Sequence, residues 1–389
     1  MKILLTGYSF TTLGGLEIVS AALARSLAEL GHEVRCAAVH GHGLFDANDY
    51  LVIGTLPASR VLRAIVHRAG FLYPLRTLRE QVAWADVIVA CHCHTMPLVW
   101  RALDGTNRRP PVVAWLHGRE VWGAMGRESA ADLKRADRLV AVSQYTSDTV
   151  ARLIGEESRP IVIHNPIDVD FFRPAASPAE IDRFTVLTVG RHDADTAHKG
   201  YGTLVDAVAK LRRTAPDLPI RLRVAGAGTR LEALKNRAAA HGLGDGVEFI
   251  GPVSKSRLRD LYATSDLFAF PSRVVVDGDQ VYGEGFGVVN IEAAACGRPV
   301  LTSTHGGCPE TILHGVTGLA VDPESVDAVA GGIEQLFRRT AEDRDDMGAR
   351  GRQFVVESFS NPVLRGQVEA VLAGLPSGRM ANTWPTTPR

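Results

Sequence analysis

Neither sign of charge is in excess in this chain of 389 residues, which carries 43 lysines and arginines and 43 aspartates and glutamates. A balanced chain has no basic field that would attract nucleic acid, so we expect no nucleic-acid partner. No apolar run reaches the about 18 residues that a membrane-spanning helix needs. The N-terminal segment Met1 to Gly7 is too short for a signal peptide and is expected to be a strand that runs into a glycine. These absences predict a soluble, cytoplasmic protein.

Cysteine is scarce, and its positions are Cys36, Cys91, Cys93, Cys296 and Cys308. Five is an odd number, so the cysteines do not form a disulfide framework. The run Cys91-His92-Cys93-His94 invites a metal interpretation. Zinc sites, however, usually separate their cysteines by about two to four residues. We therefore predict no metal site and interpret the run as a strand end that leads into a helix.

The 46% hydrophobic content and the length predict two or three globular units with a large core. Short β-branched or apolar runs alternate with amphipathic stretches along nearly the whole chain. In the first half we expect strands at residues 2–6, 33–39, 86–90, 112–116, 138–142 and 160–163, and helices that include 15–30, 73–85 and 130–135. In the second half we expect strands at 184–189, 220–225, 247–250, 267–270, 299–302 and 318–321, with helices at 202–213, 230–241, 256–264, 288–296 and 325–339. Alternation of this kind is typical of α/β domains with doubly wound parallel sheets.

The boundary between the two halves is expected near residues 164–182, which contain three prolines and no periodic pattern. We therefore predict an N-terminal Rossmann-like domain at 1–170 and a second at 171–357. Pro362 interrupts the last helical pattern, so a C-terminal helix at 358–375 is expected to pack back on the first domain. The proline-containing end, 376–389, is expected to be a flexible tail.

Two glycine-containing loops are candidates for anion binding. Gly14-Gly15 opens the first long helix, where exposed backbone N–H groups and the helix dipole favour an anion. The spacing differs from the dinucleotide fingerprint, and a tight turn without a ligand is the alternative. In the second half, Gly190-Arg191 and Lys199 flank a loop that follows a strand. Two cations at the carboxyl end of a parallel strand suit a diphosphate, although solvated surface charges are the alternative.

The most specific motif runs from Glu284 to Val300. Glu284 lies in a glycine-rich loop ahead of a helix whose N-terminus, at Phe286–Val288, would face phosphates. Glu292 lies in the middle of that otherwise apolar helix. An unpaired buried carboxylate would cost several kcal/mol. Ribose hydroxyls would supply the partner for Glu292, as they do for an acidic residue in dinucleotide-binding folds.

Together these motifs resemble the retaining glycosyltransferases of family four, which have the GT-B fold of two Rossmann-like doubly wound domains facing across a cleft. The matching segments are Gly14-Gly15, Asn165-Pro166-Ile167-Asp168 with Phe171, Gly190-Arg191, Lys199-Gly200, Gly226-Ala227-Gly228, Phe249-Ile250-Gly251, the Glu284/Glu292 unit, and His305 to Glu310. The resemblance covers nearly the full length.

The resemblance implies a role for each matching residue. Glu284 would contact the hydroxyls of the donor sugar, and Glu292 would hold the ribose. Arg191 and Lys199 would neutralise the leaving diphosphate, and His117, at the end of a strand, would approach the donor sugar. The other implied donor contacts are Gly14, Gly15, Gly190, Val253, Phe286, Gly287 and Val288. The resemblance implies no metal and no cofactor, because the nucleotide sugar is a substrate.

Two segments depart from the family pattern. His192-Asp193 follows Gly190-Arg191 where an apolar residue is frequent. Residues 272–283 form a polar insertion that is expected to be mobile and that does not select a donor.

These observations predict a retaining, metal-independent hexosyltransferase that uses a nucleotide-diphosphate sugar, UDP-linked on family frequency, and a small-molecule or saccharide hydroxyl acceptor. One alternative is a GDP-mannose-dependent mannosyltransferase acting on a membrane-surface lipid or a polysaccharide. The basic stretch Arg60 to Tyr73 permits peripheral membrane contact, but a solvated face is favoured. The acceptor is expected at residues 41–80 and 118–129.

Three further alternatives are open. A UDP-sugar epimerase of the same architecture would need acid–base groups that no motif singles out. A catalytically silent nucleotide-sugar-binding protein is disfavoured by the intact Glu284, Glu292, Arg191 and Lys199. An NAD-dependent dehydrogenase is disfavoured because no Gly-x-Gly-x-x-Gly follows the first strand.

Overall fold

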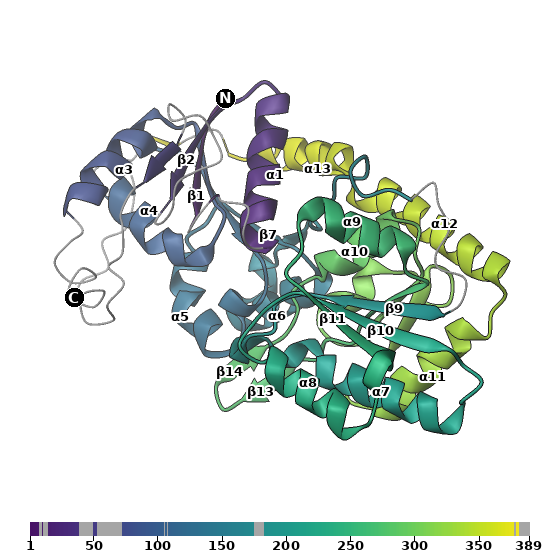
Figure 1. Ribbon diagram of the computed structural model, residues 1–389. Coiled ribbons are helices and arrows are strands. Elements are labelled where there is room, and N and C mark those ends of the chain that lie inside the picture. The colour runs from purple at the N-terminus through teal and green to yellow at the C-terminus, as the bar shows by residue number, and fades with distance from the viewer. Residues whose placement is uncertain are drawn as a thin grey trace. The chain divides into compact units, whose positions relative to one another are not determined.

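The computed structural model describes residues 1–7, 10, 15–38, 50–52, 72–104, 106, 108–174, 183–376 and 379–380. Contacts divide the chain into two compact units. The first comprises residues 1–166 with 361–389, and the second comprises residues 167–360. Each unit contains one parallel sheet covered by helices (Figure 1). Both units therefore confirm the expected α/β doubly wound class.

The sheet of the first unit has the strand order β3-β2-β1-β4-β6-β7-β8, and every pair in it is parallel. Its strands are β1 (Lys2–Gly7), β2 (Glu33–Ala38), β3 (Tyr50–Val52), β4 (Val87–Ala90), β6 (Val112–Leu116), β7 (Arg138–Ala141) and β8 (Ile161–Val162). A short antiparallel pair joins β5 (Arg108–Arg109) to β17 (Arg379–Met380). The strand order reverses direction between β1 and β4, which is the place where doubly wound sheets bind ligands.

The described helices of this unit are α1 (Gly15–Glu29), α3 (Leu72–Trp84), α4 (Met96–Leu103), α5 (Gly123–Leu133), α6 (Gln144–Ile154) and α13 (Asn361–Ala373), with short 3-10 turns η1 (Cys93–Thr95), η2 (Arg119–Val121) and η3 (Glu156–Ser158). The last helix, α13, contacts α1, and Arg365 of α13 pairs with Glu29 of α1. The helix expected at residues 130–135 covers only the C-terminal end of α5, residues 130–133. The segment 118–129, expected as an acceptor-binding loop, is a 3-10 turn followed by that helix.

The second sheet has the order β11-β10-β9-β12-β15-β16 and is also parallel throughout. Its strands are β9 (Phe184–Val189), β10 (Ile220–Ala225), β11 (Val247–Gly251), β12 (Leu267–Phe270), β15 (Val300–Ser303) and β16 (Gly318–Val321). All six residues of β9 are buried, because a central parallel strand is covered on both faces. The reversal of strand order falls between β9 and β12.

The helices of the second unit are α7 (Tyr201–Thr214), α8 (Leu231–Ala240), α9 (Lys255–Thr264), α10 (Val288–Ala295), α11 (Val326–Phe337) and α12 (Ala341–Phe359), with 3-10 turns η4 (Ala194–Lys199), η5 (Gly244–Gly246) and η6 (Cys308–Thr311). Helix α7 contacts α8 and α11, whereas α10 contacts α9 and α12, so the two groups lie on opposite faces of the sheet (Figure 1).

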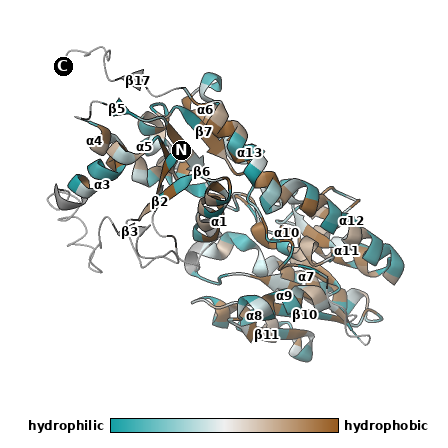
Figure 2. Ribbon diagram, turned by 90° about the horizontal axis from the view of Figure 1, so that it is seen from above, coloured by the Kyte–Doolittle hydropathy of each residue, from teal (hydrophilic) through white to brown (hydrophobic). Residues whose placement is uncertain are grey.

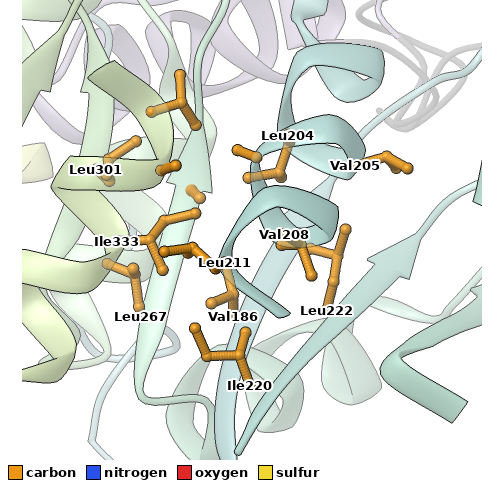
Figure 3. Close-up of a cluster of buried hydrophobic side chains, with 14 of the residues drawn as sticks. Val186, Leu204, Val205, Val208, Leu211, Ile220, Leu222, Leu267, Leu301 and Ile333 are labelled. Carbon is orange, nitrogen blue, oxygen red and sulfur yellow. The ribbon is translucent and has the colours of Figure 1, made fainter. Parts of the chain in front are cut away.

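The core of this unit lies between the sheet and the helix pair α7/α11. Figure 3 shows aliphatic side chains of both layers meeting there, and the labelled ones are Val186, Leu204, Val205, Val208, Leu211, Ile220, Leu222, Leu267, Leu301 and Ile333. The outer helix α12 shows both hydrophobic and hydrophilic segments in Figure 2. Its buried residues, such as Met347, Gly351 and Val355, recur every three or four positions, so one face of the helix packs inward.

The insertion expected as a mobile loop instead forms an antiparallel hairpin of β13 (Val275–Asp277) and β14 (Gln280–Tyr282). Its turn contains Gly278, whose φ of +57° favours glycine. The break between α12 and α13 falls at Ser360, which confirms the interruption expected near Pro362. The boundary between the two units falls between Pro166 and Ile167, within the segment 164–182 where a hinge was expected. Most of the expected tail, including residues 381–389, lies outside the described residues.

Candidate active site

The predicted donor residues of the second unit follow the carboxyl ends of its strands. Gly190 and Arg191 come directly after β9, next to the reversal of strand order between β9 and β12. Ligands of doubly wound sheets bind in the crevice at this position. The tertiary structure therefore places Gly190 and Arg191 at the edge that the sequence predicted.

The loops after β9 and β10 pack backbone against backbone. Gly190 has a φ of +155°, and a Cβ there would lie 2.1 Å from the Tyr201 hydroxyl oxygen. A Cβ on Gly226 would lie 1.9 Å from the Gly190 carbonyl oxygen. Contacts this short exclude any side chain. The glycines of both motifs are thus explained by close approach of the chain to itself.

Lys199 and Glu284, which are 85 positions apart in the sequence, come together in the structure. The Lys199 Nζ lies 3.5 Å from the Glu284 Oε2, and their side chains are only 18% and 25% exposed. The Arg191 side chain is 63% exposed and forms an ion pair with Asp193 at 3.3 Å. Burial raises the pKa of the Tyr201 hydroxyl, with opposing smaller effects from Glu284 and Arg191, so both charges lie near this tyrosine. Two cations and a carboxylate therefore surround the loop.

The glycine-rich segment ahead of α10 exposes the N-terminus of that helix. Gly287 precedes the helix with a φ of +95°, and no side chain caps its first turn. The N–H groups of that turn are thus available to an anion. A Cβ on Gly307 would lie 2.0 Å from the Gly285 carbonyl oxygen, so the segment 305–307 packs directly on this loop. The Phe286 ring is buried against Phe359, at 5.4 Å between centroids, so a ligand could contact only its backbone.

A buried amide anchors the same helix. The Asn290 Nδ2 donates hydrogen bonds to the hydroxyl oxygens of Thr302 at 2.8 Å and of Thr311 at 3.0 Å. These bonds tie the first turn of α10 to β15 and η6. The sequence analysis did not single out Asn290. Its only local signal is a polar side chain in an otherwise apolar helix.

Glu292 has a partner that the sequence analysis also missed. The Tyr262 hydroxyl, on α9, donates a hydrogen bond of 2.8 Å to the Glu292 Oε2, and Tyr262 is fully buried. Burial raises the pKa of the Glu292 carboxyl to about 7, while the Tyr262 hydrogen bond and the charge of Lys255 lower it. The ammonium group of Lys255 also lies 4.4 Å from the centre of the Phe171 ring. Only one oxygen of Glu292 is engaged by Tyr262, which leaves the other for a ligand.

Val253 lies between β11 and α9, in the segment that precedes the helix cap. Ser254 caps α9 by accepting a hydrogen bond from the Arg257 N–H. Val253 is half-buried. Val253 thus lies at the carboxyl edge of the same sheet as Arg191.

In the first unit, His117 follows β6. Its Nε2 lies 2.9 Å from the Cys91 carbonyl oxygen, and its backbone N–H donates to the Glu120 carboxylate. Burial lowers the pKa of His117, so the ring is neutral near pH 7. Because a carbonyl only accepts, the Nε2 carries the proton and the Nδ1 is left as an acceptor. Gly15 is the first residue of α1, and Gly14 lies outside the described residues.

The Cys91–His94 run occupies the end of β4 and the turn η1 before α4, which confirms a strand end leading into a helix. Burial raises the pKa of the Cys91 thiol to about 12. Burial, with the neighbouring His94 and His117, lowers the pKa of His92 to about 3. Within the described ranges, no group of three or more His, Cys, Asp or Glu residues could hold a metal ion.

None of the helices in the described part of the chain is long and apolar enough to cross a membrane. Residues 60–71 of the basic stretch Arg60 to Tyr73 lie outside the described residues. The same holds for most of the expected acceptor segment 41–80.

Two doubly wound parallel domains define an α/β protein of the Rossmann-like class, and the second has cations, carboxylates and a helix N-terminus without a side-chain cap near its sheet edge. Solved structures of the GT-B type have this fold. HepE of Anabaena in complex with UDP and glucose superposes with a TM-score of 0.76 at 21% identity, covering 96% of this chain and 100% of that chain. Sucrose-phosphate synthase from Thermosynechococcus elongatus gives a TM-score of 0.76, also at 21% identity, and covers 96% and 98% of the two chains.

Sequence comparison defines the family. The family model described as Glycosyltransferase Family 4 matches residues 13–171, and the one described as Glycosyl transferases group 1 matches residues 172–354. A GDP-mannose-dependent alpha-(1-6)-phosphatidylinositol monomannoside mannosyltransferase of Mycobacterium tuberculosis is 33% identical over 80% of this chain and 83% of its own length. A D-inositol 3-phosphate glycosyltransferase of Mycobacterium bovis is 30% identical over 78% of this chain and 62% of its own length. The chain belongs to glycosyltransferase family 4 and is a glycosyltransferase with the GT-B fold.

Proposed function

We propose that this glycosyltransferase moves a hexosyl group from a nucleoside-diphosphate sugar to a hydroxyl acceptor with retention of configuration. The observation that carries the proposal is the arrangement of two carboxylates around α10. Glu284 lies ahead of the helix and is paired with Lys199, whereas Glu292 lies within it and is held by Tyr262. One carboxylate precedes the N-terminus of α10 and the other follows it. This arrangement suits a ligand that carries hydroxyl groups on both sides of a diphosphate.

In this proposal the diphosphate binds at Arg191, Lys199 and the uncapped N-terminus of α10. The ribose hydroxyls donate to Glu292, and the base lies beside Val253. The backbones of Phe286, Gly287 and Val288 follow the phosphates, and Gly14, Gly15 and Gly190 allow close approach of the chain to them. Glu284 accepts hydrogen bonds from the transferred sugar. A sugar hydroxyl also donates to the Nδ1 of His117, because the Nε2 of that ring is already engaged.

Charge stabilisation drives the chemical step. The bond between the sugar C1 and the phosphate oxygen breaks, and its electron pair remains on the diphosphate, where Arg191 and Lys199 stabilise the negative charge. The acceptor hydroxyl attacks from the face that the phosphate leaves, and the phosphate oxygen takes its proton. The product then has the same anomeric configuration as the donor. The proposal assigns no metal, no cofactor and no general base.

Two donors are candidates. A UDP-linked hexose is the expectation from the family resemblance. GDP-mannose is the second candidate, because the mycobacterial relative with 33% identity is named for it. The names of the two relatives also suggest phosphatidylinositol mannosides and inositol 3-phosphate as acceptor types to test.

The proposal is tested with a panel of UDP-sugars and GDP-mannose, following slow donor hydrolysis without an acceptor and then transfer to inositol phosphates and to phosphatidylinositol vesicles. We expect one donor to be consumed, and NMR of the product to show retained anomeric configuration. Lys199→Ala should abolish consumption. Lys235→Ala removes an exposed lysine that is paired with Glu232, and this variant is the matched control that should retain consumption. A product of inverted configuration, or consumption unaffected by Lys199→Ala, would contradict the proposal.

A further inference from the structure

A polar cavity lies in the second unit, beside the loop that carries Lys199. Its volume is about 260 Å³, and the lining side chains used below come from the loop after β9, the start of α7, α8 and the segment after β12. None of Arg191, Lys199, Glu284 and Glu292 lines it. The helical residues that line the cavity belong to α7, α8 and the turn η4, and none belongs to α10, which packs with α9 and α12. It is therefore distinct from the proposed donor site.

Three arginines from different segments line this cavity, namely Arg230, Arg237 and Arg273. Arg237 is neutralised by Asp206, with the Nε lying 2.7 Å from the Oδ1. Arg230 and Arg273 form no ion pair with the described residues, and the Nε of Arg273 is buried without a hydrogen-bond partner.

The carboxylate of Asp193 also lines the cavity, but it is already engaged. Its Oδ1 accepts from the Thr229 N–H at 3.1 Å, and its Oδ2 pairs with Arg191 at 3.3 Å. The cavity thus has an excess of positive charge that the described side chains do not balance. An anion would balance it.

The N-terminus of α7 faces the same cavity. Gly200 precedes this 14-residue helix in the left-handed conformation, and no side chain caps the first turn. The N–H groups of that turn therefore lack intrahelical partners and point along the positive end of the helix dipole. Gly202 lines the cavity too, and a Cβ there would lie 3.7 Å from the guanidinium carbon of Arg237. The first turn and the arginine are thus close enough to contact one small anion.

A buried histidine supplies an independent sign of a missing ligand. His192 lines the cavity and is only 2% exposed, and the Ala225 backbone is the single hydrogen-bond partner that its ring approaches among the described residues, so at least one ring nitrogen has no partner. Its ring packs on Tyr201, with 4.3 Å between ring centres. Burying polar atoms without partners costs free energy, and a ligand with hydrogen-bonding oxygens would remove that cost.

We propose that this cavity binds a phosphate group, either inorganic phosphate or a small phosphomonoester. Arg230 and Arg273 bind its oxygens, the first turn of α7 donates backbone N–H groups, and His192 supplies a ring hydrogen bond. A tetrahedral dianion fits this donor set better than a carboxylate, since donors converge from three segments. Drug-sized ligands occupy pockets of about 300–1,000 Å³, so the ligand is small.

Isothermal titration of the full chain with inorganic phosphate and with glycerol 3-phosphate, at constant ionic strength, tests the proposal. We expect saturable binding of at least one of them. Tighter binding of the ester would identify a phosphomonoester as the ligand, and equal or tighter binding of phosphate would identify phosphate itself. The double variant Arg230→Gln/Arg273→Gln should bind at least about tenfold more weakly, since two charge-assisted contacts are lost.

A second variant, Gly202→Asp, is expected to block the anion site without destabilising the fold. It places a carboxylate in the first turn of α7 beside Arg237, where an acidic residue stabilises a helix. Thermal unfolding should be unchanged or raised, while phosphate binding should disappear. Arg213→Gln, which removes an exposed arginine in the last turn of the same helix, is the matched control and should bind normally.

Lys199→Ala separates this cavity from the donor site and should also bind phosphate normally. The proposal is overturned if the wild-type chain shows no saturable binding, or if the arginine and Gly202 variants bind normally. Loss of phosphate binding in Lys199→Ala would likewise overturn it, because the anion would then occupy the donor site.

Discussion

Donor affinity should depend on pH through Glu292. Burial raises the pKa of this carboxyl to about 7 in the free protein, against an ordinary value of 4.5. The charged form can accept hydrogen bonds from the Tyr262 hydroxyl at one oxygen and from the ribose at the other, whereas the protonated form loses one acceptor. Because the folded pKa is raised, the binding form predominates above about pH 7 and is lost as the pH falls through that value. Below about pH 7, affinity should approach a tenfold fall per pH unit.

The hydroxyl of Tyr262 sets the position of this transition. It donates a hydrogen bond of 2.8 Å to the Glu292 Oε2 inside a buried environment, and it lowers the carboxyl pKa. A hydrogen bond to a charged group contributes about 1.5–3 kcal/mol, which corresponds to about one to two pH units. Tyr262→Phe retains the ring that packs on Phe172 and Phe268. The variant should therefore fold and move the transition upward by about one to two pH units.

The assay is titration calorimetry with the nucleotide sugar from about pH 6 to about pH 9. The sugar ester is used because the terminal phosphate of a free nucleoside diphosphate titrates near pH 6 and would obscure the carboxyl. Glu292→Gln is the control and should bind weakly with a flat profile over this range. The reasoning is refuted if Glu292→Gln keeps the wild-type pH dependence, or if Tyr262→Phe leaves the midpoint in place.

Three further predictions concern the other proposed donor contacts. Glu284→Gln should leave binding of the free nucleotide intact and lower turnover and sugar selectivity. Glu292→Gln should instead weaken the binding of the nucleotide by about 1–3 kcal/mol. Calorimetry and rate measurements on both variants would show the reverse pattern if the donor binds in the opposite direction. Arg191→Ala or Lys199→Ala should weaken the binding of the nucleoside diphosphate by about 1.5–3 kcal/mol and leave the binding of the bare nucleoside unchanged. Equal losses of affinity for both ligands would show that the phosphate site lies elsewhere. His117→Ala should lower the rate per bound donor with nucleotide affinity retained; loss of affinity at an unchanged rate would make His117 structural.

Local sequence pattern was enough to predict the class of fold. The alternation of buried strands and amphipathic helices predicts a doubly wound sheet, because a strand covered on both faces is largely apolar, as the buried β9 is. Glycine at 190 and 287 and the acidic Glu292 were also detectable, since each conflicts with its immediate surroundings. Glycines at the start of a helix weaken the amphipathic pattern. The first turn of α5 contains Gly123 and Gly126, and the helix expected there began too late.

The partners of these residues could not be read from local pattern. Tyr262 lies on a different helix from Glu292, and Asn290 is anchored by Thr302 and Thr311 of two later elements. Arg352 donates hydrogen bonds to the carbonyl oxygens of Ala295 at 2.6 Å and Phe172 at 3.0 Å, and so joins three distant segments.

The motifs therefore identify which residues carry charge or need a glycine, because those properties belong to single residues and their neighbours in the chain. The contacts that set the pKa of Glu292, pair Lys199 with Glu284 and gather Arg230, Arg237 and Arg273 around one cavity arise from strand order and helix packing. Side chains tens of residues apart meet only when the sheet has assembled, so their distances, burial and electrostatic environment are properties of the tertiary structure.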